Sequence, residues 1–261
     1  IVCNLGTAGV ALASIISQYI SAALILLTMT REKGAANLVI FKIRPNSHMS
    51  LKILKIGLPS GLQNAVFAFA NIFIQTGVNY FDASMVAGNA AASNADPLVY
   101  DVMNAFYTAC ATFIGQNFGA GNRKRVLKSY FISLAYSFTI ALVMGVGIFC
   151  IGRQFLSLFS TDAAVIDAGM QRLSIMSLSY CISAFMDCTI AASRGLGKTG
   201  IPSFIVIMGS CVFSIIWLCT VFAWFRTIPS LFLLYAFSWA ITAAAEIAYF
   251  IHIYKKNPSV I

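Results

Sequence analysis

Two aspartates lie in segments that are otherwise apolar, and they are the residues best placed to do chemistry. Asp187 is well inside a long apolar run, and Asp96 is at the start of another. An aspartate at mid-bilayer costs about 2.5–3.5 kcal/mol on insertion scales, so it is kept mainly where it has a partner or a task. Helical spacing puts Tyr180 and Ser183 on the face of Asp187. Hydroxyls beside a carboxylate can hold a sodium ion or a proton.

A second polar stripe of similar chemistry contains Asp96. Helical spacing places Tyr100 and Asn104 on its face. Pro97 disfavours the α conformation at the preceding residue, which predicts a kink or turn near Asp96. We predict that Asp187 and Asp96 both couple to a cation. The alternative is that both make interhelical hydrogen bonds or lie at the membrane interface.

Four amides occur along one apolar segment, at Gln63, Asn64, Asn71 and Gln75. Helical periodicity groups them roughly on one side, and each needs a partner where water is absent. This pattern favours a cavity wall and amide-mediated helix packing equally. The predicted substrate cavity comprises Gln63, Asn64, Asn71, Gln75, Tyr100, Asn104, Tyr180 and Ser183.

The composition predicts helices that cross a membrane. Of the 261 residues, 59% are hydrophobic and 10% are charged, against roughly 25% charged in an average soluble domain. A helix needs about 20 mainly apolar residues to span the hydrocarbon. Segments of this kind cover residues 5–27, 56–80, 97–118, 130–152, 170–193, 201–225 and 230–254. We predict an all-α, polytopic transmembrane helical bundle of seven spans.

The positive charges predict the orientation. The net charge is +9 from 17 Lys and Arg residues, but these form short clusters between the spans, whereas a nucleic-acid partner would require one basic face or tail. All of them except Arg153, Arg172 and Arg226 fall on one side of the predicted membrane. By the positive-inside rule that side is cytoplasmic, and so is the carboxy terminus of this integral plasma (inner) membrane protein.

The connections divide the chain. Residues 28–55 form the longest and most basic connection, which predicts a cytoplasmic linker between two bundles. Residues 56–254 then form a six-helix lobe, the size of one half in transporters built from two such halves. Residues 1–27 would be the last helix of a missing amino-terminal lobe, and residues 255–261 a cytoplasmic tail.

Several short motifs occur in an order that resembles a known family. Residues 57–63 read Gly-Leu-Pro-Ser-Gly-Leu-Gln, residues 115–122 read Gly-Gln-Asn-Phe-Gly-Ala-Gly-Asn, and residues 192–198 read Ala-Ser-Arg-Gly-Leu-Gly-Lys. With residues 87–91 and 104–107, they resemble the multidrug and toxic compound extrusion (MATE) family.

The resemblance implies a twelve-helix antiporter with two lobes. Its members exchange Na⁺ or H⁺ for amphipathic or cationic organic compounds, so membrane lipid, such compounds and the missing lobe are the expected partners. Asp187 falls on a helix where many members have an acidic coupling residue, with a possible Na⁺ there, and Asp96 matches an acid common in related bacterial sequences. The glutamate that some members carry in the segment matching residues 56–80 is replaced here by amides.

Two other functions remain as alternatives, and enzymes form a third class to compare. A lipid-linked oligosaccharide flippase of the same superfamily should have a more basic cavity. A seven-helix receptor or photoreceptor matches only the helix count, because no span contains a mid-membrane lysine for a retinal link. An enzyme is not expected, since His48 and His252 lie at loop and helix-end positions without a metal-binding constellation.

Overall fold

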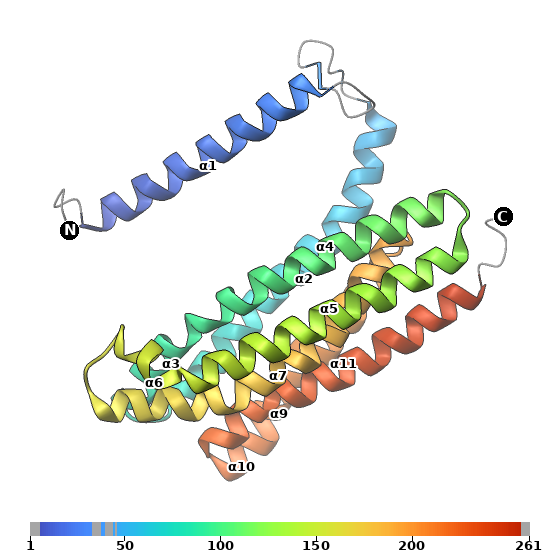
Figure 1. The fold of residues 1–261 in the computed structure, drawn as a ribbon. Helices are drawn as coiled ribbons and strands as arrows, with labels where there is room; N and C mark the ends of the chain where they lie inside the picture. Colours follow the sequence, from blue (N-terminus) through green and yellow to red (C-terminus); the bar gives the residue numbers. More distant parts are fainter. Residues whose placement is uncertain (1–5, 33–37, 40–43, 45, 257–261) are drawn as a thin grey trace. The chain divides into compact units, whose positions relative to one another are not determined.

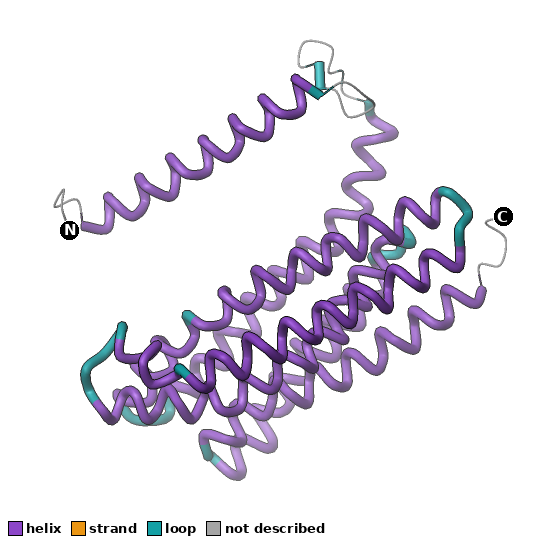
Figure 2. The backbone as a smooth tube through the Cα atoms, viewed as in Figure 1, coloured by secondary structure: helices purple, strands orange, loops and turns teal. Residues whose placement is uncertain are grey.

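The computed structural model describes residues 6–32, 38–39, 44 and 46–256, and within them the regular structure is entirely helical (Figures 1 and 2). The chain divides into two compact units, Ile1–Lys52 and Ile53–Ile261. The first unit contains α1 (Gly6–Arg31), and the second begins inside α2 (Ser47–Val78). The second unit continues with α3 (Ala83–Ser93), α4 (Ala95–Gly119), α5 (Arg123–Cys150), α6 (Gly152–Ser157), α7 (Ala163–Gly195), α8 (Gly200–Val206), η2 (Ile207–Val212), α9 (Phe213–Trp217), η3 (Leu218–Phe222), α10 (Ala223–Phe225) and α11 (Ile228–Lys256).

Five helical segments are long and apolar enough to cross a membrane: Ala11–Arg31, Arg123–Cys150, Ala163–Gly195, Gly200–Phe225 and Ile228–Lys256. The prediction of an all-α transmembrane protein is therefore confirmed. The count of seven spans is not confirmed, because α2 and α4 are long enough but carry polar side chains that lower their hydropathy.

Helix α2 begins earlier than the sequence predicts. The Asn46 side-chain oxygen accepts the backbone N–H groups of His48 at 3.0 Å and Met49 at 3.2 Å, which satisfies donors that the first turn leaves free. The last part of the predicted linker 28–55 is therefore helical. Residues 33–37, 40–43 and 45 of that linker lie outside the described residues.

The predicted break near Asp96 is present as a turn at Asn94, between α3 and α4. The Asn94 amide donates to the carbonyls of Ala90 at 3.0 Å and Ala91 at 3.1 Å, and so completes the end of α3. Pro97 lies in the first turn of α4, where its missing N–H costs no helical hydrogen bond. The turn places Asp96 at the beginning of α4.

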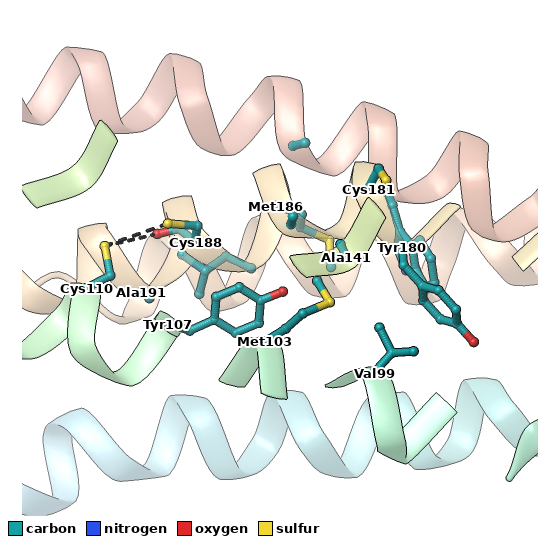
Figure 3. Close-up of a cluster of buried hydrophobic side chains, with 14 of the residues drawn as sticks. Val99, Met103, Tyr107, Cys110, Ala141, Tyr180, Cys181, Met186, Cys188 and Ala191 are labelled. Carbon is teal, nitrogen blue, oxygen red and sulfur yellow. Dashed lines mark hydrogen bonds between the residues drawn. The ribbon is translucent and has the colours of Figure 1, made fainter. Parts of the chain in front are cut away.

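The core lies where α4, α5 and α11 pack on α7 (Figure 1). Small residues allow close approach: a Cβ atom at Gly195 of α7 would lie 2.7 Å from the Ala111 carbonyl oxygen of α4. Figure 3 shows the α4 side chains Met103, Tyr107 and Cys110 beside α7, where the Cys110 and Cys188 sulfur atoms are 3.7 Å apart. Helix α7 is therefore the central helix, against which the side chains of α4, α5 and α11 pack.

Candidate functional site

The two predicted coupling acids border the same cavity, which lies within the unit Ile53–Ile261 and has a volume of about 320 Å³. Its lining comes from α2, α4, α7 and α11: Phe67, Asn71, Asp96, Tyr100, Met176, Met186, Asp187, Tyr235 and Trp239. The volume lies near the lower end of small-molecule pockets, about 300–1,000 Å³. The structure thus brings Asp96 and Asp187 to one space.

Asp96 already has a full set of partners on α7. One carboxylate oxygen forms an ion pair with Arg172 at 2.5 Å, and the other accepts the Tyr180 hydroxyl at 2.5 Å. The Arg172 side chain is only 5% exposed, and its guanidinium lies over the ring of Phe232. We call Asp96, Arg172 and Tyr180 the Asp96 cluster. Its charge is balanced, and it joins α4 to α7.

Asp187 differs because it is half-buried without a hydrogen bond or ion pair among the described residues. Its charge interacts with that of Arg194, which lies about two turns further along the same face of α7. Arg194 in turn donates to the Gln63 side-chain oxygen of α2 at 2.9 Å. Glu246 of α11 also interacts electrostatically with Arg194. We call Asp187, Arg194 and Glu246 the Glu246 cluster.

Aromatic rings form one wall of the cavity. The Tyr100 ring meets Tyr180 edge-on with centroids 5.7 Å apart, and it meets Trp239 edge-on at 6.3 Å. Tyr235 packs against Trp239 at 5.4 Å. Faces of such rings attract organic cations, most strongly at Trp. A cationic guest beside Asp187 would therefore meet both a carboxylate and aromatic surfaces.

Several predicted cavity residues lie elsewhere. Only Asn71 and Tyr100 of the predicted set line the cavity. Tyr180 is buried beneath it in the Asp96 cluster, and the Ser183 hydroxyl donates to the Tyr180 carbonyl at 2.9 Å. Asn104 is exposed on α4 outside the lining.

The remaining amides of α2 also lie outside the cavity. Gln63 is buried against Arg194, Asn64 is exposed, and Gln75 donates to the Asn79 side-chain oxygen at 3.0 Å. At about 100° per residue, these positions spread over roughly a third of the helix circumference. Of the four amides, Asn71 alone is among the residues that line the cavity.

Sequence reasoning missed that Arg172 is buried and that Arg194 is half-buried. It assigned Arg172 to the outer side of the membrane with Arg153 and Arg226, and Arg194 to the cytoplasmic side, because both flank apolar segments. Helix α7 begins at Ala163 and places Arg172 two turns before Tyr180, on the same face. That spacing was a usable signal for Arg172, whereas the Arg194 contact with Gln63 joins positions far apart in the chain.

Comparison with known proteins agrees with this architecture. The MatE family model matches residues 59–220, more than half of the chain. The chain belongs to the MatE family. The members of this family are transporters, so the seven-helix receptor alternative is rejected. With its membrane-length helices, the protein is an integral membrane protein.

Two curated MatE relatives give the extent of the match. The probable multidrug resistance protein NorM of Thermotoga maritima is 24% identical over 219 residues, which cover 78% of this chain and 44% of NorM. The probable multidrug resistance protein YpnP of Bacillus subtilis is 31% identical over 179 residues, covering 68% of this chain and 39% of YpnP. The chain therefore spans less than half the length of these MatE relatives.

Solved structures show the same fold. The MATE transporter ClbM in complex with Rb⁺ matches with a TM-score of 0.79 at 21% sequence identity, covering 100% of this chain and 58% of ClbM. At this identity the likeness establishes the MATE transporter fold alone.

Among the described residues, no group of three or more His, Cys, Asp or Glu side chains could hold a metal ion.

Proposed function

We propose that this chain is part of a secondary antiporter that exports amphipathic or cationic organic compounds in exchange for Na⁺ or H⁺. The observation that carries the proposal is the unpaired carboxyl group of Asp187 in a cavity walled by Tyr100, Tyr235 and Trp239. A carboxyl group in a water-poor site favours its neutral form, while a bound cation stabilises the ionised form. Competing cations can therefore replace one another at this group.

Such replacement is the basis of coupling. Binding of one occupant weakens binding of the other, and this reciprocal effect is a coupling free energy. The relative ClbM was solved with Rb⁺, a monovalent cation, which supports a cation as the coupling partner here. The carboxyl group of Asp187 suits both a proton and Na⁺.

The cavity lining favours cationic compounds over a lipid-linked oligosaccharide. Asp187 contributes a negative charge, Asp96 is neutralised by Arg172, and no lining residue is basic. A flippase for a phosphate-linked lipid would need cations that attract phosphate. Transport of such a lipid with no effect of organic cations would favour the flippase.

The test uses the transporter that includes this chain, in sealed vesicles loaded with ethidium. A proton gradient or a sodium gradient is applied separately, and efflux is followed by fluorescence. Asp187→Asn keeps the size of the side chain but removes its charge, and it should abolish gradient-driven efflux. Asp101→Asn alters an exposed acid of α4 and serves as the matched control. Efflux by Asp187→Asn at the parent rate would contradict the role of this carboxyl group.

We further propose that the six-helix lobe 56–254 works with a second lobe, which the length of the relatives supports. One lobe supplies one wall, and alternating access requires two repeats that rock around the site. This chain alone should therefore not export ethidium. Export by the purified, monomeric chain would show that a second lobe is unnecessary.

The orientation can be tested on two exposed positions of the second unit. Lys124 at the start of α5 should be cytoplasmic with the carboxy terminus, and Trp224 in α10 should be outside. In intact cells an impermeant thiol reagent should label Trp224→Cys but not Lys124→Cys, relative to the parent protein. The reverse pattern would invert the proposed topology.

A further inference from the structure

Glu246 of α11 is a carboxylic acid sealed inside the second unit. Its exposure is 0%, and neither carboxyl oxygen has a hydrogen-bond partner among the described residues. Burying a polar group without a partner is costly, and burying an isolated charge costs far more. Because Glu246 is covered by its own lobe, charges outside this lobe cannot contact its oxygens.

Among the described residues, Arg194 is the one cation shown to interact with Glu246, while Arg123 of α5 contacts α11 at Tyr254, about two turns further along. Helix α11 packs against α7 and against the segment from α8 to η3. Arg194 on α7 interacts with both Glu246 and Asp187, and Tyr249 is the titratable neighbour on α11 itself. The segment from α8 to η3 contributes Cys211 and Cys219 but no Asp, Glu, Lys or Arg. Arg194 must therefore balance two acids.

Charge counting shows that this arrangement is incomplete. The Asp96 cluster is neutral, since Arg172 and Asp96 form an ion pair. In the Glu246 cluster, Arg194 remains protonated under all ordinary conditions, so two ionised acids would leave one excess negative charge. A low-dielectric interior strengthens that repulsion. One proton or one monovalent cation must then accompany the cluster.

We propose that Glu246 is a second cation-exchange group beside Asp187. It holds a proton while Asp187 is ionised, and the two acids share Arg194. The proposal rests on the proposed antiport function for the arrival of an organic cation at Asp187. Glu246 does not line the cavity, so it meets no substrate and acts as a proton store.

The exchange is balanced in charge. Before binding, ionised Asp187 and Arg194 compensate each other and Glu246 is neutral. An organic cation at Asp187 then compensates that carboxylate, which leaves Arg194 to stabilise ionised Glu246. The Glu246 O–H bond breaks, and its proton leaves to water. One cation enters as one proton departs, and the cluster stays neutral in both states.

Infrared difference spectroscopy on the purified transporter, titrated with pH in the absence of any substrate, tests the proton store. Glu246→Gln should lose a C=O stretching band of a protonated carboxyl group that the parent protein shows, and Asp101→Asn should keep that band. Arg194→Gln removes the shared cation, so its carboxyl band should be larger and persist to higher pH. A parent spectrum unchanged by Glu246→Gln would overturn the proposal.

A second measurement follows proton release when ethidium is added to weakly buffered protein. The parent should release about one proton per bound ethidium, by linkage between the two binding events. Glu246→Gln should release no proton when ethidium binds, because the ionisable group is gone. It should also bind ethidium more weakly, because Arg194 then lacks a counter-charge once ethidium occupies Asp187. Unchanged release by Glu246→Gln would refute the store. Absence of ethidium binding by the parent counts against the proposed function instead, and the infrared titration still decides the role of Glu246.

Discussion

The two acid clusters of this MatE lobe each contain one arginine, but they differ in charge balance. In the Asp96 cluster one arginine and one tyrosine satisfy one carboxylate, with both contacts at 2.5 Å. In the Glu246 cluster one arginine faces two acids, and Glu246 has no hydrogen-bond partner among the described residues. From this difference we expect an acid in a membrane helix to take an exchange role when its compensation is incomplete.

The difference in charge balance also predicts that one cluster serves stability and the other serves transport. A complete ion pair joins two helices, and removal of one partner leaves an isolated buried charge. An incomplete cluster adds less to the stability of a single state, but its balance changes whenever a cation binds. We therefore expect variants of the Asp96 cluster to affect folding most, and variants of the Glu246 cluster to affect coupling most.

The largest effect on stability is expected for Arg172→Met. Asp96 loses its buried counter-charge, which costs about 3–5 kcal/mol when a buried pair is broken. Thermal unfolding in detergent should show a much lower Tm than the parent. The double variant Arg172→Met with Asp96→Asn removes both charges and should recover most of the loss. An unchanged Tm in the single variant would show that the pair does not stabilise the lobe.

Tyr180→Phe should have a smaller effect. It removes one of the two hydrogen-bond donors to Asp96 and keeps the ring contact with Tyr100 and the ion pair with Arg172. Hydrogen bonds to charged groups contribute about 1.5–3 kcal/mol. The matched control is Tyr136→Phe, an exposed tyrosine of α5. Equal Tm values for the two variants would show that the Tyr180 hydroxyl does not stabilise the fold.

Asn104→Ala should have the smallest effect on folding. This amide is exposed on α4 and belongs to neither cluster, and substitutions at such positions usually stay within about 0.5 kcal/mol. Tm and ethidium binding of the purified chain should both match the parent. A fall in Tm comparable to that of Tyr180→Phe would restore Asn104 as a structural residue of the polar stripe.

Much of the architecture could be predicted from the sequence because it depends on local patterns. Apolar length predicts the membrane helices, and Pro97 predicts the break that lies at Asn94. The boundary of α2 was missed because Asn46 falls within the predicted linker 28–55, whereas it caps a helix that begins at Ser47.

The pairing of charges could not be predicted in the same way. Their cost in a membrane predicts that Asp187 and Asp96 carry chemistry, and both line one cavity. That Arg172 neutralises only Asp96 depends on how α4 packs against α7, which no local pattern contains. The isolation of Glu246 likewise depends on the packing of α11 against α7.

The most direct test compares Asp187→Asn with Asp96→Asn in proteoliposomes of the transporter on a solid-supported membrane. A sudden change in sodium concentration or pH drives charge movement into the site, and the transient current measures it. The account predicts that Asp187→Asn loses this current, while Asp96→Asn keeps most of it because its carboxylate is already paired with Arg172. Loss of the current in Asp96→Asn with the parent current in Asp187→Asn would contradict the account.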